Sequence, residues 1–163
     1  MRNRTRAREL ALQILYQLDL REDGLDEHLD DLILDTVNPD EPEPEDVLSF
    51  SRGLVEGVLK TREEADRIIT EVAEHWDVAR MAAIDRNILR IAVYEMTSRT
   101  DIPPKVSINE AIELGKKYST QQSGAFINGI LDRIRRQIED AGKLDQAGLD
   151  QAELGQAELG QEG

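Results

Sequence analysis

The sequence predicts an all-α protein of about seven helices, and three observations predict this class. Apolar residues recur three and four positions apart along most of the 163-residue chain, and no segment shows the alternation typical of a strand. Strong helix formers dominate, whereas the residues that favour strands are sparse. The breaks between periodic segments are short, so neighbouring helices are expected to pack antiparallel.

The first half of the chain predicts four helices. The first covers residues 5–21, and Gly24 is a plausible stop signal behind it. A short amphipathic helix follows over residues 25–33, and the proline-rich residues 38–44 form a loop. A helix resumes near Glu45. The pattern Thr61-Arg62-Glu63-Glu64 resembles a capping box and predicts that another helix starts there.

The second half predicts three helices and a tail. Residues 81–96 are apolar nearly all round, which predicts a central helix. A second capping-box pattern, Ser107-Ile108-Asn109-Glu110, predicts the next helix start. The polar residues 119–124 separate that helix from the last one, over residues 126–138. We therefore expect one helical domain, residues 1–143. The acidic five-residue repeat of residues 144–163, rich in glycine, predicts a disordered tail.

The charge of the chain is segregated. There are 34 acidic and 20 basic residues, which gives a net charge of −14. Residues 22–48 hold twelve acidic residues and no lysine or arginine, and the tail holds five acidic residues and no base. The rest of the chain is slightly basic, so the acidic composition does not exclude a nucleic acid as partner.

Several classes of chemistry are excluded. The chain has no cysteine and only two histidines, His28 and His75, so we expect no disulfide, metal site or thiol nucleophile. No glycine-rich phosphate loop, nucleophile elbow or zinc-binding helix motif occurs, so we expect neither an enzyme nor a cofactor. Glu95, inside the apolar helix, is expected to be a partly buried hydrogen-bond acceptor. Without a membrane span or a signal peptide, a cytoplasmic location is expected.

A basic and aromatic set of residues suggests RNA binding. Arg4, Arg6 and Arg8 alternate with smaller residues at the start of the first helix. Clustered arginines neutralise phosphates, and exposed aromatic rings beside them can stack unpaired bases. The rings in question are Tyr16, Tyr118 and Phe126. Periodicity alone leaves open that Tyr16 and Phe126 belong to the core.

Four stretches carry a resemblance to a known family. They are residues 6–18 (RARELALQILYQL), 88–95 (ILRIAVYE), 106–114 (VSINEAIEL) and 126–132 (FINGILD). Together they closely resemble the NusB family of bacterial transcription antitermination factors, over about residues 4–138. The pairing of VSINEAIEL with FINGILD is the most specific part of the resemblance.

The resemblance implies a fold and a function. The fold would consist of two small helical bundles that share one core. NusB-like proteins pair with NusE, a ribosomal protein, bind single-stranded boxA RNA of ribosomal RNA transcripts, and act within the RNA polymerase antitermination complex. They thereby help to suppress premature Rho-dependent termination. The positions that match RNA-facing residues of the family are Arg4, Arg6, Arg8, Tyr16, Arg90, Tyr118 and Phe126. Whether the protein forms a homodimer is a question that the sequence leaves open.

Two other hypotheses remain. The same helical domain occurs fused to ribosomal RNA methyltransferases, but this chain shows no catalytic domain and no cysteine for that chemistry. The domain could also bind only proteins, in which case the acidic residues 22–48 would meet a basic ribosomal protein and speed the association. Binding of S-adenosylmethionine would support the first hypothesis. An absence of RNA binding would support the second.

Overall fold

A computed structural model describes residues 2–21, 29–74 and 78–161, and in these residues the chain is entirely helical apart from turns and loops. The predicted all-α class is therefore confirmed, with six α-helices and one 3₁₀ turn in the described part, against about seven expected. His28, His75 and the stop signal at Gly24 lie outside the described residues. The elements are α1 (Arg2–Leu20), α2 (Leu29–Thr36), α3 (Glu45–Ala73), η2 (Val78–Arg80), α4 (Ala83–Ser98), α5 (Pro104–Tyr118) and α6 (Gln121–Gln161).

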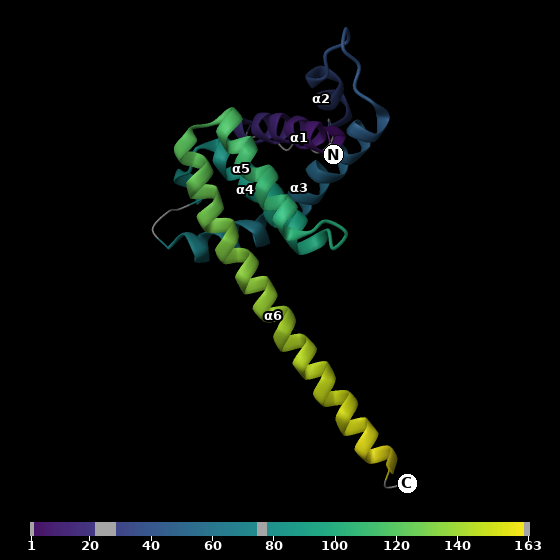
Figure 1. Ribbon diagram of the computed structural model, residues 1–163. Coiled ribbons are helices and arrows are strands. Elements are labelled where there is room, and N and C mark those ends of the chain that lie inside the picture. The colour runs from purple at the N-terminus through teal and green to yellow at the C-terminus, as the bar shows by residue number, and fades with distance from the viewer. Residues whose placement is uncertain (1, 22–28, 75–77, 162–163) are drawn as a thin grey trace.

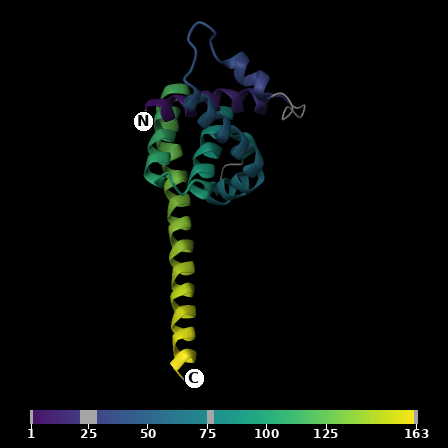
Figure 2. The same cartoon turned by 90° about the vertical axis from the view of Figure 1, so that its right-hand side faces the viewer.

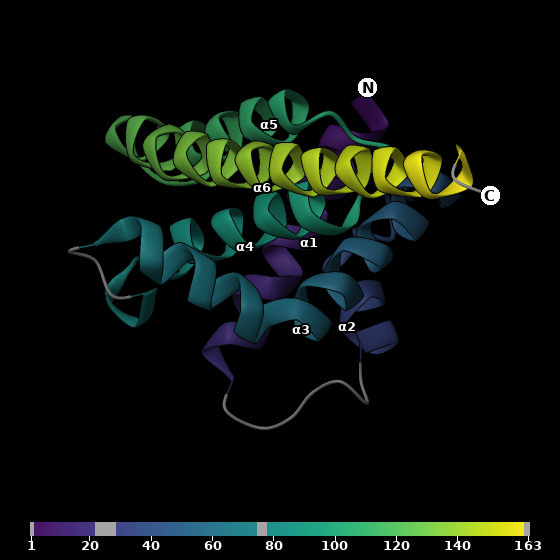
Figure 3. The same ribbon diagram turned by 90° about the horizontal axis from the view of Figure 1, so that it is seen from below.

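The helices form two small bundles fused around α4. Helices α1, α2 and α3 lie on one side, and α5 and α6 lie side by side on the other (Figure 1, Figure 3). Helix α4 packs against α1, α3, α5 and α6, which confirms the prediction that the most apolar segment is central. Nearly all buried apolar side chains of both bundles belong to one continuous cluster, so the bundles share a single hydrophobic core.

The long helix α3 is the largest departure from the predicted elements. It runs unbroken from Glu45 to Ala73, so the predicted helix start at Thr61 is wrong. The Thr61 hydroxyl donates a 2.7 Å hydrogen bond to the carbonyl oxygen of Gly57, four residues earlier. Threonine makes this bond inside a helix as readily as it caps one, which is why the motif misleads.

The start of α5 differs from the prediction for a related reason. The helix begins at Pro104, three residues before Ser107, and proline suits the first turn because that turn needs no N–H donor. Ser107 therefore lies inside the helix, where its hydroxyl donates a 2.9 Å hydrogen bond to the buried carboxylate of Glu95. The proline-rich loop of residues 38–44 is confirmed between α2 and α3.

Helix α6 extends far beyond the folded body. Its first half packs on α5 and α4, and its second half projects away (Figure 1, Figure 2). Residues 144–161 continue this helix in the structure, whereas the sequence predicts a disordered tail. A glycine-rich helix that leaves the body gains little from tertiary packing, and isolated helices are marginal in water. The disorder of the tail in solution therefore stays a prediction.

None of the described helices combines the length and the apolar composition needed to cross a bilayer.

Candidate nucleic-acid interface

The three arginines at the start of α1 occupy three different environments. Arg4 is exposed, and its guanidinium lies 4.8 Å from the ring centre of Phe50 on α3. The Nε of Arg6 donates to Glu43, a residue of the acidic loop, at 2.6 Å. The side chain of Arg6 keeps 38% of its surface exposed, against 14% for Glu43. Arg4 and Arg6 can therefore still reach a phosphate.

Arg8 differs from the other two because it is buried. Only 2% of Arg8 and 1% of Glu95 are exposed. Two hydrogen bonds of 2.8 and 2.7 Å join the Arg8 guanidinium to the Glu95 carboxylate in a bidentate pair. A second carboxylate, that of Glu110 on α5, lies 3.6 Å from Arg8. Glu95 is thus a buried acceptor, as predicted, and Arg8 ties α1 to α4 and α5 instead of facing solvent.

Tyr118, at the end of α5, is fixed to α1 through Glu9. The Tyr118 hydroxyl donates to the Glu9 carboxylate, and the Lys117 ammonium donates to the same oxygen at 2.7 Å. Burial opposes ionisation of Glu9, but the bonds from Lys117 and Tyr118 outweigh it and lower its pKa. Burial and the bond to Glu9 raise the pKa of Tyr118. Tyr16 is half-exposed two turns beyond Glu9 on α1, so both lie on one face of the helix.

Arg90 belongs to a polar network between α1, α3 and α4. It is only 4% exposed, and it donates two hydrogen bonds of 2.7 and 2.9 Å to Asp66. Asp19, at the end of α1, accepts from Arg86 at 2.6 and 2.8 Å and from Asn87 at 3.0 Å. Burial opposes ionisation of Asp19, but the bond from Arg86 and the charge of Arg90 prevail and lower its pKa.

Phe126 lines a small groove at the start of α4. The groove has a volume of about 260 Å³ and lies where the first turn of α6 meets η2 and the start of α4. Ser123 donates a 3.2 Å hydrogen bond to Oδ2 of Asp85 there, and Oδ1 of Asp85 is buried without a hydrogen bond. Phe126 is half-buried, so its ring is partly accessible and partly packed on the core. The sequence left open whether Phe126 is exposed or belongs to the core, and the structure shows some of each.

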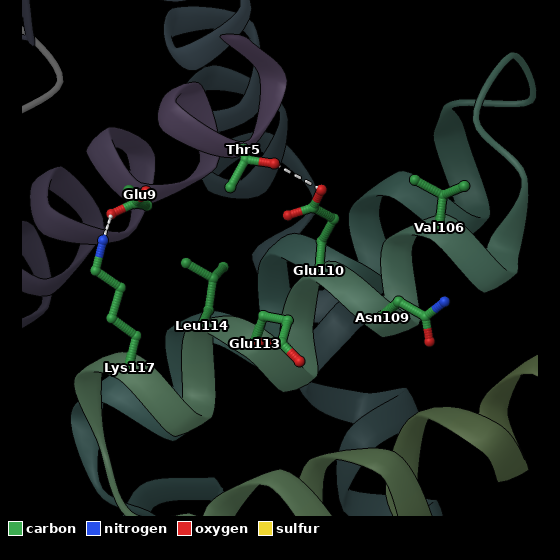
Figure 4. A pocket seen from close by; sticks show the side chains of 8 residues that line it. All are labelled: Thr5, Glu9, Val106, Asn109, Glu110, Glu113, Leu114 and Lys117. Atoms are coloured by element: carbon green, nitrogen blue, oxygen red, sulfur yellow. Dashed lines mark hydrogen bonds and ion pairs between the residues drawn. The ribbon is translucent and has the colours of Figure 1, made fainter. Parts of the chain in front are cut away.

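A wider groove runs between α1 and α5 (Figure 4). Its volume is about 450 Å³, and its lining is Thr5, Glu9, Val106, Asn109, Glu110, Glu113, Leu114 and Lys117. Three glutamates face one lysine, and that lysine is already paired with Glu9. This surplus of carboxylates disfavours a phosphate in the groove and favours a basic group.

The structure therefore divides the seven predicted residues. Arg4, Arg6, Tyr16, Tyr118 and Phe126 keep accessible surface, whereas the charges of Arg8 and Arg90 are buried and paired. Direct RNA contact by any of them stays a prediction, and for Arg8 and Arg90 burial changes the expected role to support of the fold. Sequence reasoning missed Phe50, because no periodic stripe singles it out. Among the described residues, no group of three or more metal-ligating side chains is assembled.

Comparison with known proteins places this geometry in a family. The NusB family model matches residues 5–136. The antitermination protein NusB of Anaeromyxobacter dehalogenans strain 2CP-1 is 50% identical over 131 residues, which cover 80% of this chain and 89% of that protein. The NusB protein of Geobacter sulfurreducens is 47% identical over 135 residues, which cover 83% of this chain and 95% of that protein.

Solved structures agree with the sequence comparison. Thermotoga maritima NusB superposes with a TM-score of 0.72 at 34% identity, covering 82% of this chain and 90% of that one. A crystal structure of the antitermination factors NusB and NusE in complex with double-stranded RNA matches with a TM-score of 0.71 at 29% identity, covering 83% and 98%. The match of the family model, the identities and the shared fold together show that this chain belongs to the NusB family.

Proposed function

We propose that this protein is a transcription antitermination factor that binds single-stranded boxA RNA together with NusE. In this role it would act in the cytoplasm within the RNA polymerase antitermination complex, suppress premature Rho-dependent termination of ribosomal RNA transcripts, and carry out no catalysis. The observation that carries the proposal is helix α1, where Arg4 and Arg6 stay accessible in the first half and Tyr118 is tied to Glu9 beside them. Tyr16 presents ring surface further along the same helix.

The chemistry of this surface suits an unpaired strand. Arginine donates to phosphate oxygens through a planar fork, and aromatic rings stack any base, at about 1–3 kcal/mol per base. A single strand can also expose its base edges, which are the groups that distinguish one sequence from another. Membership of the NusB family and the likeness to a complex of NusB and NusE with double-stranded RNA support RNA binding together with NusE. The preference for an unpaired strand rests on the chemistry of the surface.

For NusE we propose the groove between α1 and α5. Ribosomal proteins contact RNA and are in general basic, and the lining of the groove holds three glutamates against one lysine. It also lies on the helix that carries Arg4 and Arg6, so a bound partner would lie beside the RNA. Reversal of the exposed charge in Glu113→Lys should weaken NusE binding, and Glu139→Lys on α6 is the matched control.

The proposed function is tested by filter binding of the full chain to a boxA-type strand and to a scrambled strand of equal length. The two titrations are repeated at several salt concentrations, with and without NusE. We expect tighter binding to the boxA-type strand and a further gain with NusE. Equal affinity for both strands in the presence of NusE would exclude the function.

A further inference from the structure

Three arginines from distant parts of the chain surround one phenylalanine. The ring of Phe50, on the second turn of α3, is half-buried against the core. The guanidinium carbons of Arg4, Arg8 and Arg99 lie 4.8, 5.6 and 5.2 Å from its centre. Arg4 and Arg8 come from α1, and Arg99 directly follows the end of α4. Distances under about 6 Å are typical of cation–π contacts.

The three arginines differ in how far their guanidinium groups are available to a further acceptor. The bonds of Arg8 to Glu95 are buried, so Arg8 belongs to the fold. Arg4 is exposed, and none of the described residues pairs with its guanidinium by a hydrogen bond or ion pair. Arg99 donates from Nε and Nη2 to Asp101 at 3.0 and 2.9 Å, which leaves the N–H bonds of Nη1 for another acceptor.

We propose that Phe50 is a positioning residue that holds Arg4 and Arg99 as a fixed two-arginine contact for the phosphate backbone of the bound RNA. This inference rests on the proposed function and adds two residues, Phe50 and Arg99, to the predicted surface. A guanidinium stacked on a ring keeps its N–H edges free for a phosphate. A side chain that is already ordered also loses less entropy when it binds.

The local charge agrees with this assignment. The Arg99 guanidinium holds the pKa of Asp101 at about 2, so Asp101 is ionised at neutral pH and neutralises one arginine. Arg8 is balanced by Glu95, and Arg4 therefore gives the exposed part of the cluster a net positive charge. We expect the phosphate to meet Arg4 and the Nη1 edge of Arg99, on the side away from the Asp101 carboxylate.

The experiment measures how RNA affinity depends on salt for four variants of the full chain. Phe50→Leu keeps an apolar side chain but removes the ring face, whereas Phe50→Trp keeps a ring face. Arg99→Gln removes one predicted contact directly. Arg136→Gln is the matched control, because Arg136 is an exposed, ion-paired arginine on α6, outside the cluster. Labelled boxA-type RNA is titrated between about 50 and about 200 mM salt, and thermal unfolding is recorded in parallel.

Each phosphate contact to a single strand contributes about 0.7 to the slope of log affinity against log salt. We expect Arg99→Gln to flatten the slope by about 0.7. Phe50→Leu should lower the affinity, because both arginines must be ordered on binding, and should flatten the slope by up to about 1.4 because they no longer hold the phosphate in place. Phe50→Trp and Arg136→Gln should keep the wild-type slope. A merely structural role of Phe50 would change the unfolding temperature but not the slope.

Two results would overturn the inference while leaving the proposed function intact. One is a wild-type slope for both Arg99→Gln and a folded Phe50→Leu variant. The other is an equal loss of slope in Arg99→Gln and Arg136→Gln, which would mean that any surface arginine has the same effect. If Phe50→Leu does not fold, the comparison of the salt slopes of Arg99→Gln and Arg136→Gln decides whether the inference holds. If the wild-type chain with NusE does not prefer the boxA-type strand, the proposed function fails and the inference fails with it.

Discussion

The buried ion pair between Arg8 and Glu95 allows the structure to be tested quantitatively. The substitution Glu95→Gln keeps the shape of the side chain but removes its charge, so the guanidinium of Arg8 would lose its bidentate partner while it stays 2% exposed. Breaking a buried pair from one side costs about 3–5 kcal/mol. The remaining carboxylate near Arg8, at 3.6 Å on Glu110, and the neutral amide reduce the loss, so we expect about 3 kcal/mol.

The assay is urea unfolding followed by circular dichroism, with thermal unfolding beside it. For a domain of this size, about 3 kcal/mol corresponds to a fall of about 6–12 °C in the unfolding temperature. The double variant Arg8→Met with Glu95→Leu replaces the whole pair by apolar groups and should recover most of the stability. A loss below about 1 kcal/mol in Glu95→Gln, with an unchanged urea dependence, would refute the reasoning.

The same double variant also decides what Arg8 does for RNA. If Arg8 only supports the fold, the stable double variant should bind RNA with the affinity of the wild-type chain. If Arg8 contacts a phosphate, the variant should remain folded and lose affinity, with a flatter dependence on salt.

Three further predictions follow from single contacts. Gly57→Ala should lower the free energy of unfolding in urea by about 1–3 kcal/mol, because an added Cβ would lie 2.1 Å from the Tyr94 ring. In Gly53→Ala the added Cβ meets no atom within 4 Å, so the free energy of unfolding should rise by up to about 1 kcal/mol. Glu43→Gln should raise RNA affinity at low salt several-fold, because it releases Arg6 from its ion pair. The control Glu41→Gln removes an exposed acid of the same loop and should raise the affinity less. Equal gains in the two variants would mean that only the net charge matters. Because the pKa of Asp19 is lowered in the folded state, its contribution to stability is complete above the unfolded value of about 4 and is lost as the pH falls through the folded pKa. Unfolding measured between about pH 7 and about pH 3 should therefore show a smaller loss on acidification in Asp19→Asn than in wild type.

The elements that follow from local patterning were predictable from the sequence. The apolar stripe of α1 and the central position of α4 depend on spacing alone, and both are found in the structure. The proline-rich loop follows from the conformational restriction of proline. Glu95 was predictable as a buried acceptor, because a carboxylate surrounded by apolar residues must be paired.

The partners of the charged residues could not be predicted in this way. Arg8 and Glu95 are 87 positions apart, and no local pattern brings them together. An arginine-rich start looks the same in sequence whether its side chains face solvent or the core. For the same reason Phe50 was missed, since the arginines around it come from α1 and from the end of α4. The capping-box pattern at Thr61 failed because the hydroxyl had an equally good acceptor inside the helix.

The most direct test of the central claim is the RNA affinity of the double variant Arg4→Gln with Arg6→Gln, measured with NusE bound. This variant keeps Arg8 and hence the buried pair. Thermal unfolding recorded in parallel separates a lost RNA contact from a loss of folding, because the Arg6–Glu43 ion pair and the Arg4–Phe50 contact are removed. We expect unchanged affinity for NusE, weaker binding to the boxA-type strand, and a salt dependence flatter by about 1.4. Wild-type affinity and salt dependence in this variant would contradict the assignment of RNA binding to the start of α1.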